Sequence, residues 1–253
     1  MFNNAIVRKP GKCLVNGLTS ANLGAPDYSK AILQHRDYCN ALASCGVEVT
    51  ILVADEAYPD STFIEDTALL TPRCAIMTNP GAPSRQGEVG SIKSTVEQFY
   101  STIENIQSPG TVEAGDIMMV GNHFYIGISA RTNDNGATQL AEILKKYDHS
   151  SSTIPLNTML HLKTGLSYLE NNNLLICGEF LSEPAFNSFN KVIIPESESY
   201  AANCIWVNDT VLVPRGYPIT RQCVMDLGYT VVDLEMSEFQ KLDGGLSCLS
   251  LRF

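Results

Sequence analysis

The C-terminal segment carries the residue best suited to nucleophilic chemistry. Cys248 follows two adjacent glycines in the run Asp243-Gly244-Gly245-Leu246-Ser247-Cys248. Glycines let the backbone take unusual dihedral angles and approach a ligand closely, and a thiol presented after such a turn can act as a covalent nucleophile. The same position also fits a small apolar residue on a final strand. The local pattern leaves both interpretations open.

A cysteine nucleophile needs a general base, and the chain has only 4 histidines. Three of them have simple surface explanations: His35 within a charged helical stretch, His123 in a hairpin turn, and His149 at a helix end, where a cation is favourable beside the helix dipole. His161, on a short expected strand that runs into a glycine, is the better candidate. No two histidines have the spacing of metal ligands, so no metal site is predicted.

Two acidic clusters could receive a cation or orient a general base. Their carboxylates belong to Asp60, Glu65, Asp66, Glu113 and Asp116. Apolar neighbours indicate partial burial of both clusters, although a solvated loop face stays open as an alternative. Arg85 and Arg131 stand alone in loops rich in Gly and Ser, and isolated arginines of this kind can clamp a carboxylate through two hydrogen bonds.

The composition narrows the classes of function. The 253 residues include 27 acidic and 17 basic side chains, which gives a net charge of −10 at pH 7. With 44% hydrophobic and 17% charged residues, the chain can bury a core and is not intrinsically disordered. The acidic balance argues against nucleic acid and against an anionic membrane surface. It is compatible with a cationic small substrate and equally with ordinary solubility.

Motifs for metals, redox chemistry and nucleotides are missing from the sequence. The 8 cysteines form no CxxC pair, so scattered free thiols are expected rather than a zinc ribbon or a disulfide framework. No G-x-G-x-x-G or Walker A motif joins a strand to a helix, and no cofactor is predicted. Residues 1–12 lack the apolar run of a signal peptide, and no apolar stretch approaches the length of a membrane span. These features predict a cytoplasmic protein.

The elements that must position the candidate residues alternate between short strands and helices, without a linker. Helices are expected at residues 27–46, 91–102, 133–147 and 220–227. Strands are expected at 4–8, 47–53, 68–70, 74–78, 161–162, 167–169, 174–177, 206–207, 211–214, 230–234 and 246–252, with a hairpin over 116–128. The order gives roughly five strand-strand-helix-strand units in one α/β domain over residues 1–253.

Five sequence blocks, taken together, resemble bacterial dimethylarginine dimethylaminohydrolase (dimethylargininase), a family of the guanidine-modifying pentein superfamily. The blocks follow one another along the whole chain as Gly17–Ser20, Phe63–Thr67, Gly110–Asp116, His161–Gly165 and Asp243–Cys248. Each block is weak alone, but their order and spacing make the resemblance specific. It implies a single-domain five-bladed α/β propeller, in agreement with the repeated units. One conservative departure is Thr67, where some relatives carry proline.

The resemblance also implies a role for each candidate residue. Cys248 would be the nucleophile, His161 the general acid/base, and Glu113 the residue that orients the imidazole. Asp66 would hold the guanidinium nitrogens of the substrate. The remaining substrate contacts would come from Arg85 and Arg131, which bind the α-carboxylate, and from Leu18, Asp60 and Glu65, which complete the pocket.

The implied reaction is hydrolysis of Nω,Nω-dimethyl-L-arginine or Nω-methyl-L-arginine to L-citrulline and dimethylamine or methylamine, through a thiouronium on Cys248. Two alternatives stay open. One is arginine deiminase activity, although those enzymes are longer and carry an inserted helical domain. The other is a catalytically silent pentein that binds methylarginine or a protein. The expected partner is a small-molecule substrate. The oligomeric state is open, with a homodimer as one option.

Overall fold

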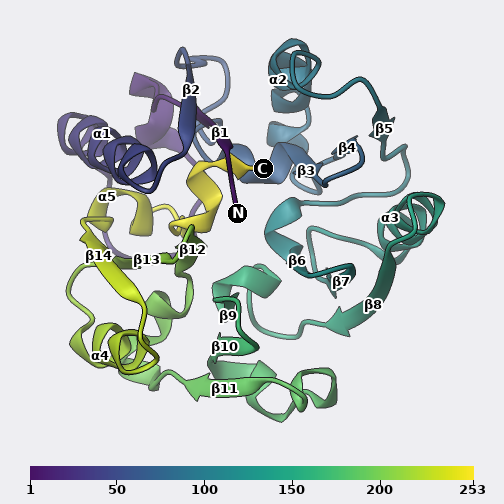
Figure 1. Ribbon diagram of the computed structural model, residues 1–253. Helices are drawn as coiled ribbons and strands as arrows, with labels where there is room; N and C mark the ends of the chain where they lie inside the picture. The colour runs from purple at the N-terminus through teal and green to yellow at the C-terminus, as the bar shows by residue number, and fades with distance from the viewer.

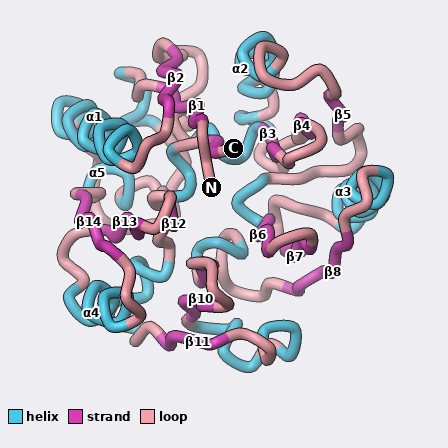
Figure 2. The backbone as a smooth tube through the Cα atoms, in the orientation of Figure 1, coloured by secondary structure: helices cyan, strands magenta, loops and turns pink.

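The computed structural model describes residues 1–253 as five small sheets arranged in a ring (Figures 1 and 2). Each sheet has three strands: an inner strand near the ring axis, a middle strand antiparallel to it, and an outer strand parallel to the middle one. Parallel neighbours need a crossover, which a helix or short turns supply on the outside of the ring. The fold is therefore the five-bladed α/β propeller that the sequence predicts.

Four blades are built from consecutive strands. From the inner to the outer strand they are β3 (Ala68–Leu70), β4 (Ala75–Met77) and β5 (Ile103–Asn105); β6 (Ile117–Val120), β7 (His123–Ile128) and β8 (Ser150–Pro155); β9 (Leu166–Tyr168), β10 (Asn173–Ile176) and β11 (Asn190–Ile193); and β12 (Ile205–Val207), β13 (Thr210–Pro214) and β14 (Thr230–Leu234).

The fifth blade joins the two ends of the chain and closes the ring. Its inner strand is β15 (Leu251–Arg252), which pairs antiparallel with β1 (Asn4–Arg8), and β1 pairs parallel with β2 (Glu48–Leu52). Both termini therefore lie near the axis (Figure 1). Closure of the ring brings the segment just before β15, which contains Cys248, to the centre of the molecule.

Helices cover the outside of the ring (Figure 2). They are α1 (Tyr28–Ser44), α2 (Glu88–Val96), α3 (Asp134–Lys146), α4 (Pro218–Asp226) and the short α5 (Ser237–Gln240). The crossover of the blade β9–β11 has two 3₁₀ turns, η6 (Gly178–Ser182) and η7 (Pro184–Phe186), in place of a helix. None of the helices combines the length and apolar character needed to cross a membrane.

A 3₁₀ turn precedes the inner strand of every blade. These turns are η2 (Ile64–Thr67), η4 (Ala114–Asp116), η5 (Leu162–Thr164), η8 (Glu196–Ala202) and η9 (Ser247–Leu249). They contact one another in the order η9, η2, η4, η5 and η8 around the axis. Four of the five sequence blocks described above lie on or beside these turns. The fold therefore gathers the candidate residues from four different blades.

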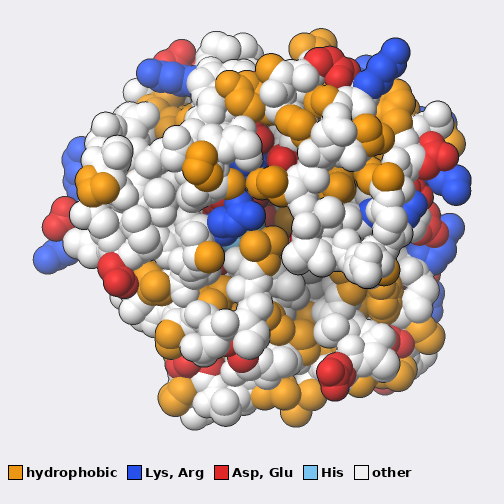
Figure 3. Space-filling view, turned by 180° about the vertical axis from the view of Figure 1, so that it is seen from behind, with side chains coloured by type: hydrophobic (Ala, Val, Ile, Leu, Met, Phe, Trp, Pro, Cys, Tyr) orange, Lys and Arg blue, Asp and Glu red, His pale blue; other side chains and the backbone are white.

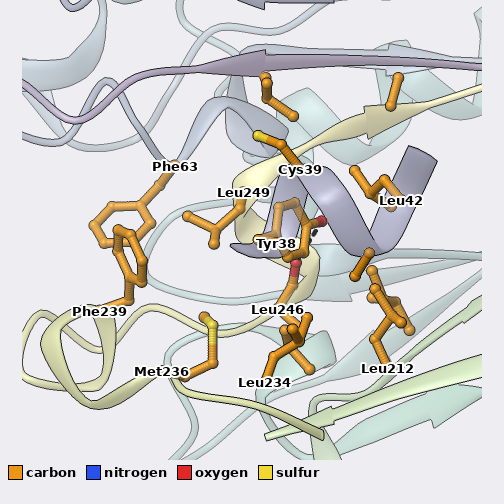
Figure 4. Close-up of a cluster of buried hydrophobic side chains, with 14 of the residues drawn as sticks. Tyr38, Cys39, Leu42, Phe63, Leu212, Leu234, Met236, Phe239, Leu246 and Leu249 are labelled. Carbon is orange, nitrogen blue, oxygen red and sulfur yellow. Dashed lines mark hydrogen bonds between the residues drawn. The ribbon is translucent and has the colours of Figure 1, made fainter. Parts of the chain in front are cut away.

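The apolar core fixes the backbone on both sides of Cys248 (Figure 4). Tyr38, which is fully buried on α1, donates its hydroxyl to the carbonyl oxygen of Leu246 at 3.0 Å, and its Oη lies 2.6 Å from Oγ of Ser250. Leu246 and Leu249 pack into the same buried cluster. Because burial of one leucine contributes about 1.5–3 kcal/mol, this packing holds the segment that contains Cys248 firmly.

Several elements differ from the sequence prediction. The helix expected at 91–102 is α2 at 88–96, and its last residues give way to a loop before β5. The sequence predicts no strand at β5, β8 or β11, because these segments are short, include exposed polar residues and lack a clear alternation of apolar and polar residues. The strands expected at 161–162 and 246–252 were wrong except at Leu251–Arg252: His161 precedes η5, and Cys248 lies within η9. The alternative placement of Cys248 on a final strand is therefore also wrong, although its side chain packs against the apolar core.

Candidate active site

A cavity of about 230 Å³ lies at the axis of the ring. Seen from behind the view of Figure 1, the surface is hollowed near its middle, where basic and acidic side chains gather (Figure 3). Eight of the nine predicted site residues line the cavity: Leu18, Asp60, Asp66, Arg85, Glu113, Arg131, His161 and Cys248. The ninth, Glu65, lies elsewhere and is described below.

Cys248 is presented by a segment that packs too closely for side chains at its two glycines. A Cβ on Gly244 would lie 2.2 Å from the ring of Phe63, and a Cβ on Gly245 would lie 2.5 Å from the side chain of Asn203. The backbone N–H of Gly245 points at Sγ of Cys248, with an N to Sγ distance of 3.4 Å. Burial and the nearby carboxylates raise the pKa of the thiol to about 12, so the empty site holds a thiol rather than a thiolate.

His161 and Glu113 form a buried hydrogen-bonded pair. Nε2 of His161 lies 2.8 Å from Oε2 of Glu113. Burial opposes the charge on the imidazole, but Asp66, Glu113 and Asp116 outweigh it and raise the pKa of His161 to about 9. The pKa of Glu113 is lowered although its burial acts in the opposite direction, because His161 donates to it. At neutral pH the pair is therefore an imidazolium and a carboxylate, which can give a proton to a leaving group.

Asp66 lies on η2 and is held from two sides. Nη1 of Arg85 lies 2.6 Å from Oδ2, and the backbone N–H of Gly115 donates to Oδ1 at 2.9 Å. The pKa of Asp66 is lowered against the effect of its burial, because His161 and Arg85 supply positive charge. Asp66 is therefore a carboxylate at the cavity wall, as a partner for a guanidinium must be.

Asp60 and Leu18 meet at the cavity rim. The backbone N–H of Leu18 donates to Oδ1 of Asp60 at 3.0 Å, and Leu18 itself is 43% exposed. Ser20, two residues further along, binds Asp243. Its backbone N–H and its hydroxyl both donate to Oδ2 of Asp243, and the hydroxyl does so at 2.9 Å. The loop that carries Leu18 is thus attached to both sides of the opening.

The two predicted carboxylate-binding arginines differ in their surroundings. The Arg85 side chain is 6% exposed and already has partners in Asp66, Glu88 and the carbonyl oxygen of Phe63. The Arg131 side chain is 22% exposed, and its one ion pair is a 3.3 Å contact from Nη1 to Oε1 of Glu113. Arg131 therefore has guanidinium N–H groups left for a ligand. Arg85 lines the same cavity, and its contact with a substrate carboxylate stays a prediction.

Glu65 faces away from the main cavity. Its Oε1 lies 2.5 Å from Nζ of Lys163, and its Oε2 accepts from Oγ of Ser247 at 2.9 Å. These three residues line both a 40 Å³ pocket that Cys248 and His161 also line and a 170 Å³ cavity further along the axis. A substrate contact of Glu65 stays a prediction. Its surroundings are those of a buried ion pair beside Cys248.

Asp66, Glu113 and His161 also have the geometry of a potential metal site, since their ligand atoms lie within 4.8 Å of one another. The two carboxylates and Nε2 of His161 have protein partners already. Asp66 binds Arg85 and Gly115, while Glu113 binds His161 and accepts from the backbone N–H of Ala82 at 3.1 Å. The arrangement needs no metal to balance its charges.

Some residues at the site had no role in the sequence interpretation. Asp116 belongs to a recognised acidic cluster, and Ser247 to the block before Cys248, but neither position indicates a function alone. Asp243 has a φ of 58°, which non-glycine residues rarely adopt, and its side chain holds Ser20. An aspartate directly before two glycines was the available signal for such a turn.

The comparisons with known proteins agree with this geometry. A family model described as N,N dimethylarginine dimethylhydrolase, eukaryotic, matches residues 25–193. The N(G),N(G)-dimethylarginine dimethylaminohydrolase of Pseudomonas aeruginosa is 58% identical over 254 residues, with 100% of both chains covered. A solved structure of the P. aeruginosa enzyme, in which serine replaces a cysteine, contains citrulline and matches with a TM-score of 0.99 at 57% identity over 100% of both chains. A dimethylarginine dimethylaminohydrolase variant with glycine in place of a histidine, solved as an adduct with S-methyl-L-thiocitrulline, matches equally well, with a TM-score of 0.99 at 57% identity and 100% of both chains covered.

A five-bladed ring with a cysteine, a histidine and carboxylates on converging turns defines a hydrolase of the pentein fold, acting on C–N bonds of linear amidines. The fold and the similarity over the full length together identify the group within that class. The chain belongs to the dimethylarginine dimethylaminohydrolase family.

Proposed function

We propose that this protein hydrolyses Nω,Nω-dimethyl-L-arginine and Nω-methyl-L-arginine to L-citrulline and the corresponding amine, as one catalytic unit over residues 1–253. The observation that carries the proposal is the position of Cys248 in a cavity that also holds the His161–Glu113 pair and Asp66. A guanidinium bound by these carboxylates would have its central carbon beside the thiol. The citrulline and S-methyl-L-thiocitrulline complexes of the similar enzymes support the same substrate class.

The first half of the reaction forms a covalent intermediate. The cationic substrate lowers the pKa of Cys248, whose proton leaves to solvent, and the thiolate attacks the guanidinium carbon to form a C–S bond. Nε2 of His161 stays bound to Glu113, so the proton on the other ring nitrogen, Nδ1, is the one that passes to the departing amine. The C–N bond breaks and leaves a thiouronium on Cys248 and a neutral imidazole.

The second half uses water. Neutral His161 takes a proton from the water, the hydroxide adds to the same carbon, and the C–S bond breaks to release citrulline and Cys248. Asp66 fixes the guanidinium nitrogens throughout, and Arg131 at the cavity mouth binds the α-carboxylate and sets the distance to the thiol. Leu18 completes the rim, with Asp60 holding its backbone.

A citrulline assay with dimethylarginine, monomethylarginine and arginine tests the proposal. We expect citrulline from the methylated substrates, little from arginine, and none from the Cys248→Ser variant. A preference for arginine would support the deiminase alternative. Binding of methylarginine without any citrulline would support a silent pentein and contradict the proposed reaction. The cytoplasmic location stays a prediction, and the oligomeric state stays open, with a homodimer as one option.

A further inference from the structure

We infer that Asp116 is a positioning residue that joins the loop of the general acid/base to the loop of the carboxylate-binding arginine. The inference rests on the proposed function, because it assigns a task within the same reaction. The side chain of Asp116 is 0% exposed and ends η4 directly before β6. Asp116 does not line the substrate cavity, so it must act through other residues.

One oxygen of Asp116 holds the backbone that follows His161. The N–H of Leu162, the first residue of η5, donates to Oδ1 of Asp116 at 3.0 Å. Gly127 on β7 leaves room for this contact, because a Cβ there would lie 3.0 Å from Oδ1 of Asp116 and 3.1 Å from Cβ of Leu162. The direction in which the chain presents His161 therefore depends on this oxygen.

The other oxygen of Asp116 holds the Arg131 loop. The hydroxyl of Ser129 donates to Oδ2 at 2.7 Å, and the same hydroxyl oxygen accepts from the backbone N–H groups of Arg131 at 2.9 Å and Thr132 at 3.1 Å. A serine oxygen has two lone pairs and one hydrogen. Both lone pairs are in use here, so the hydrogen must point at Asp116.

Only a carboxylate satisfies both loops. Two buried donors, the Leu162 N–H and the Ser129 O–H, meet Asp116, and an asparagine in its place has a single acceptor oxygen. The negative charge has a second effect, because it helps to keep His161 protonated. Three carboxylates surround His161, namely Asp66, Glu113 and Asp116. Cys248, Arg85 and Arg131 line the same cavity as His161. Lys163, on the turn η5 that follows His161, is paired to Glu65.

Three variants separate position from charge. In Asp116→Asn we expect kcat to fall about 10- to 100-fold and KM to rise, because both ends of the site shift. The high-pH limb of kcat should also move to lower pH. In Ser129→Ala, the hydrogen bond from Leu162 to Asp116 and the charge of Asp116 remain. KM should therefore rise, while the high-pH limb of kcat should stay at the same pH. In Gly127→Ala, the charge of Asp116 remains but Leu162 is displaced. The value of kcat should therefore fall, while its high-pH limb should stay at the same pH.

An NMR titration of the His161 ring in the substrate-free protein gives a readout that does not need activity. The pKa of His161 should fall in Asp116→Asn, which a purely structural role would not produce. Folded Asp116→Asn with kcat, KM and the His161 pKa of the parent protein would overturn the inference. If that variant does not fold, an unchanged KM in Ser129→Ala together with an unchanged kcat in Gly127→Ala would overturn it. A parent protein that makes no citrulline would contradict the proposed function alone, since the titration still tests Asp116.

Discussion

Glu113 and His161 share a hydrogen bond of 2.8 Å between Oε2 and Nε2, with side chains that are only 0% and 10% exposed. Removed from water, the two charges stabilise each other more strongly than they would at the surface. The pair links two neighbouring blades, since Glu113 precedes η4 and His161 precedes η5. The acid/base chemistry therefore depends on the assembled ring.

The variant Glu113→Gln tests the charge of this pair. His161 has a pKa raised to about 9 in the substrate-free protein, and the proposed reaction needs its imidazolium, so kcat/KM should hold up to about pH 9 and then fall in the parent protein. Loss of the carboxylate lowers that pKa, so we expect kcat/KM near neutral pH to drop about 100-fold and its high-pH limb to move to lower pH. The measurement is kcat/KM against pH. As a control, Glu142→Gln on the exposed side of α3 should change neither the value near neutral pH nor the position of the high-pH limb. An unchanged high-pH limb in Glu113→Gln would contradict the role of Glu113 in keeping His161 protonated.

The ionisation of Cys248 should depend on a bound cation. Burial, Glu65 and Asp66 raise the pKa of the thiol to about 12 in the empty site, and a guanidinium between thiol and carboxylates would reverse part of that effect. We expect a cationic haloacetamidine to alkylate Cys248 at neutral pH, and a neutral haloacetamide of the same size to react slowly until the pH is high. Mass spectrometry of the peptide with Cys248 separates it from the other thiols. Equal apparent pKa values with the two reagents would disprove the idea.

Much of this site could be predicted from the sequence. The remaining features could not be predicted, because they depend on very short turns or on contacts between blades. Cys248 and His161 stand out because a rare reactive side chain lies beside glycines. The sequence predicts strands where the structure has 3₁₀ turns at Cys248 and directly after His161, because three residues are too few to show a period. The contacts of Glu65 with Lys163 and Ser247 could not be predicted, since both partners come from other blades. The direction of a side chain depends on the assembled ring and not on its neighbours in sequence.

Gly115 should be required for activity, because the absence of a side chain there makes room for His161 and Asp66. A Cβ at Gly115 would lie 2.8 Å from Nδ1 of His161 and 3.0 Å from Oδ1 of Asp66. Both groups would have to move, so we expect Gly115→Ala to lower kcat about 100-fold. Gly90→Ala is the matched control, because Gly90 lies within α2 with no atom near its Cβ position, and alanine there should raise helix stability by about 1 kcal/mol. Normal turnover by Gly115→Ala would show that the site tolerates the shift.

Arg85 and Arg131 should affect different quantities when each is replaced by methionine. Arg85→Met leaves the buried carboxylates of Asp66 and Glu88 unpaired, and breaking a buried ion pair in this way costs about 3–5 kcal/mol. Arg131→Met removes one partly exposed contact, so its cost in stability should stay near 1 kcal/mol or less, while KM rises because the α-carboxylate loses its partner.

Urea denaturation and steady-state kinetics on both variants measure the two effects. A loss of several kcal/mol is expected for Arg85→Met, as is a raised KM with a nearly normal unfolding midpoint for Arg131→Met. The partners of the two side chains predict this difference: Arg85 is already paired with Asp66 and Glu88, whereas Arg131 has a single ion pair. The opposite pattern, with Arg131→Met unstable and Arg85→Met impaired only in KM, would mean that Arg85 is the residue that binds the substrate's α-carboxylate.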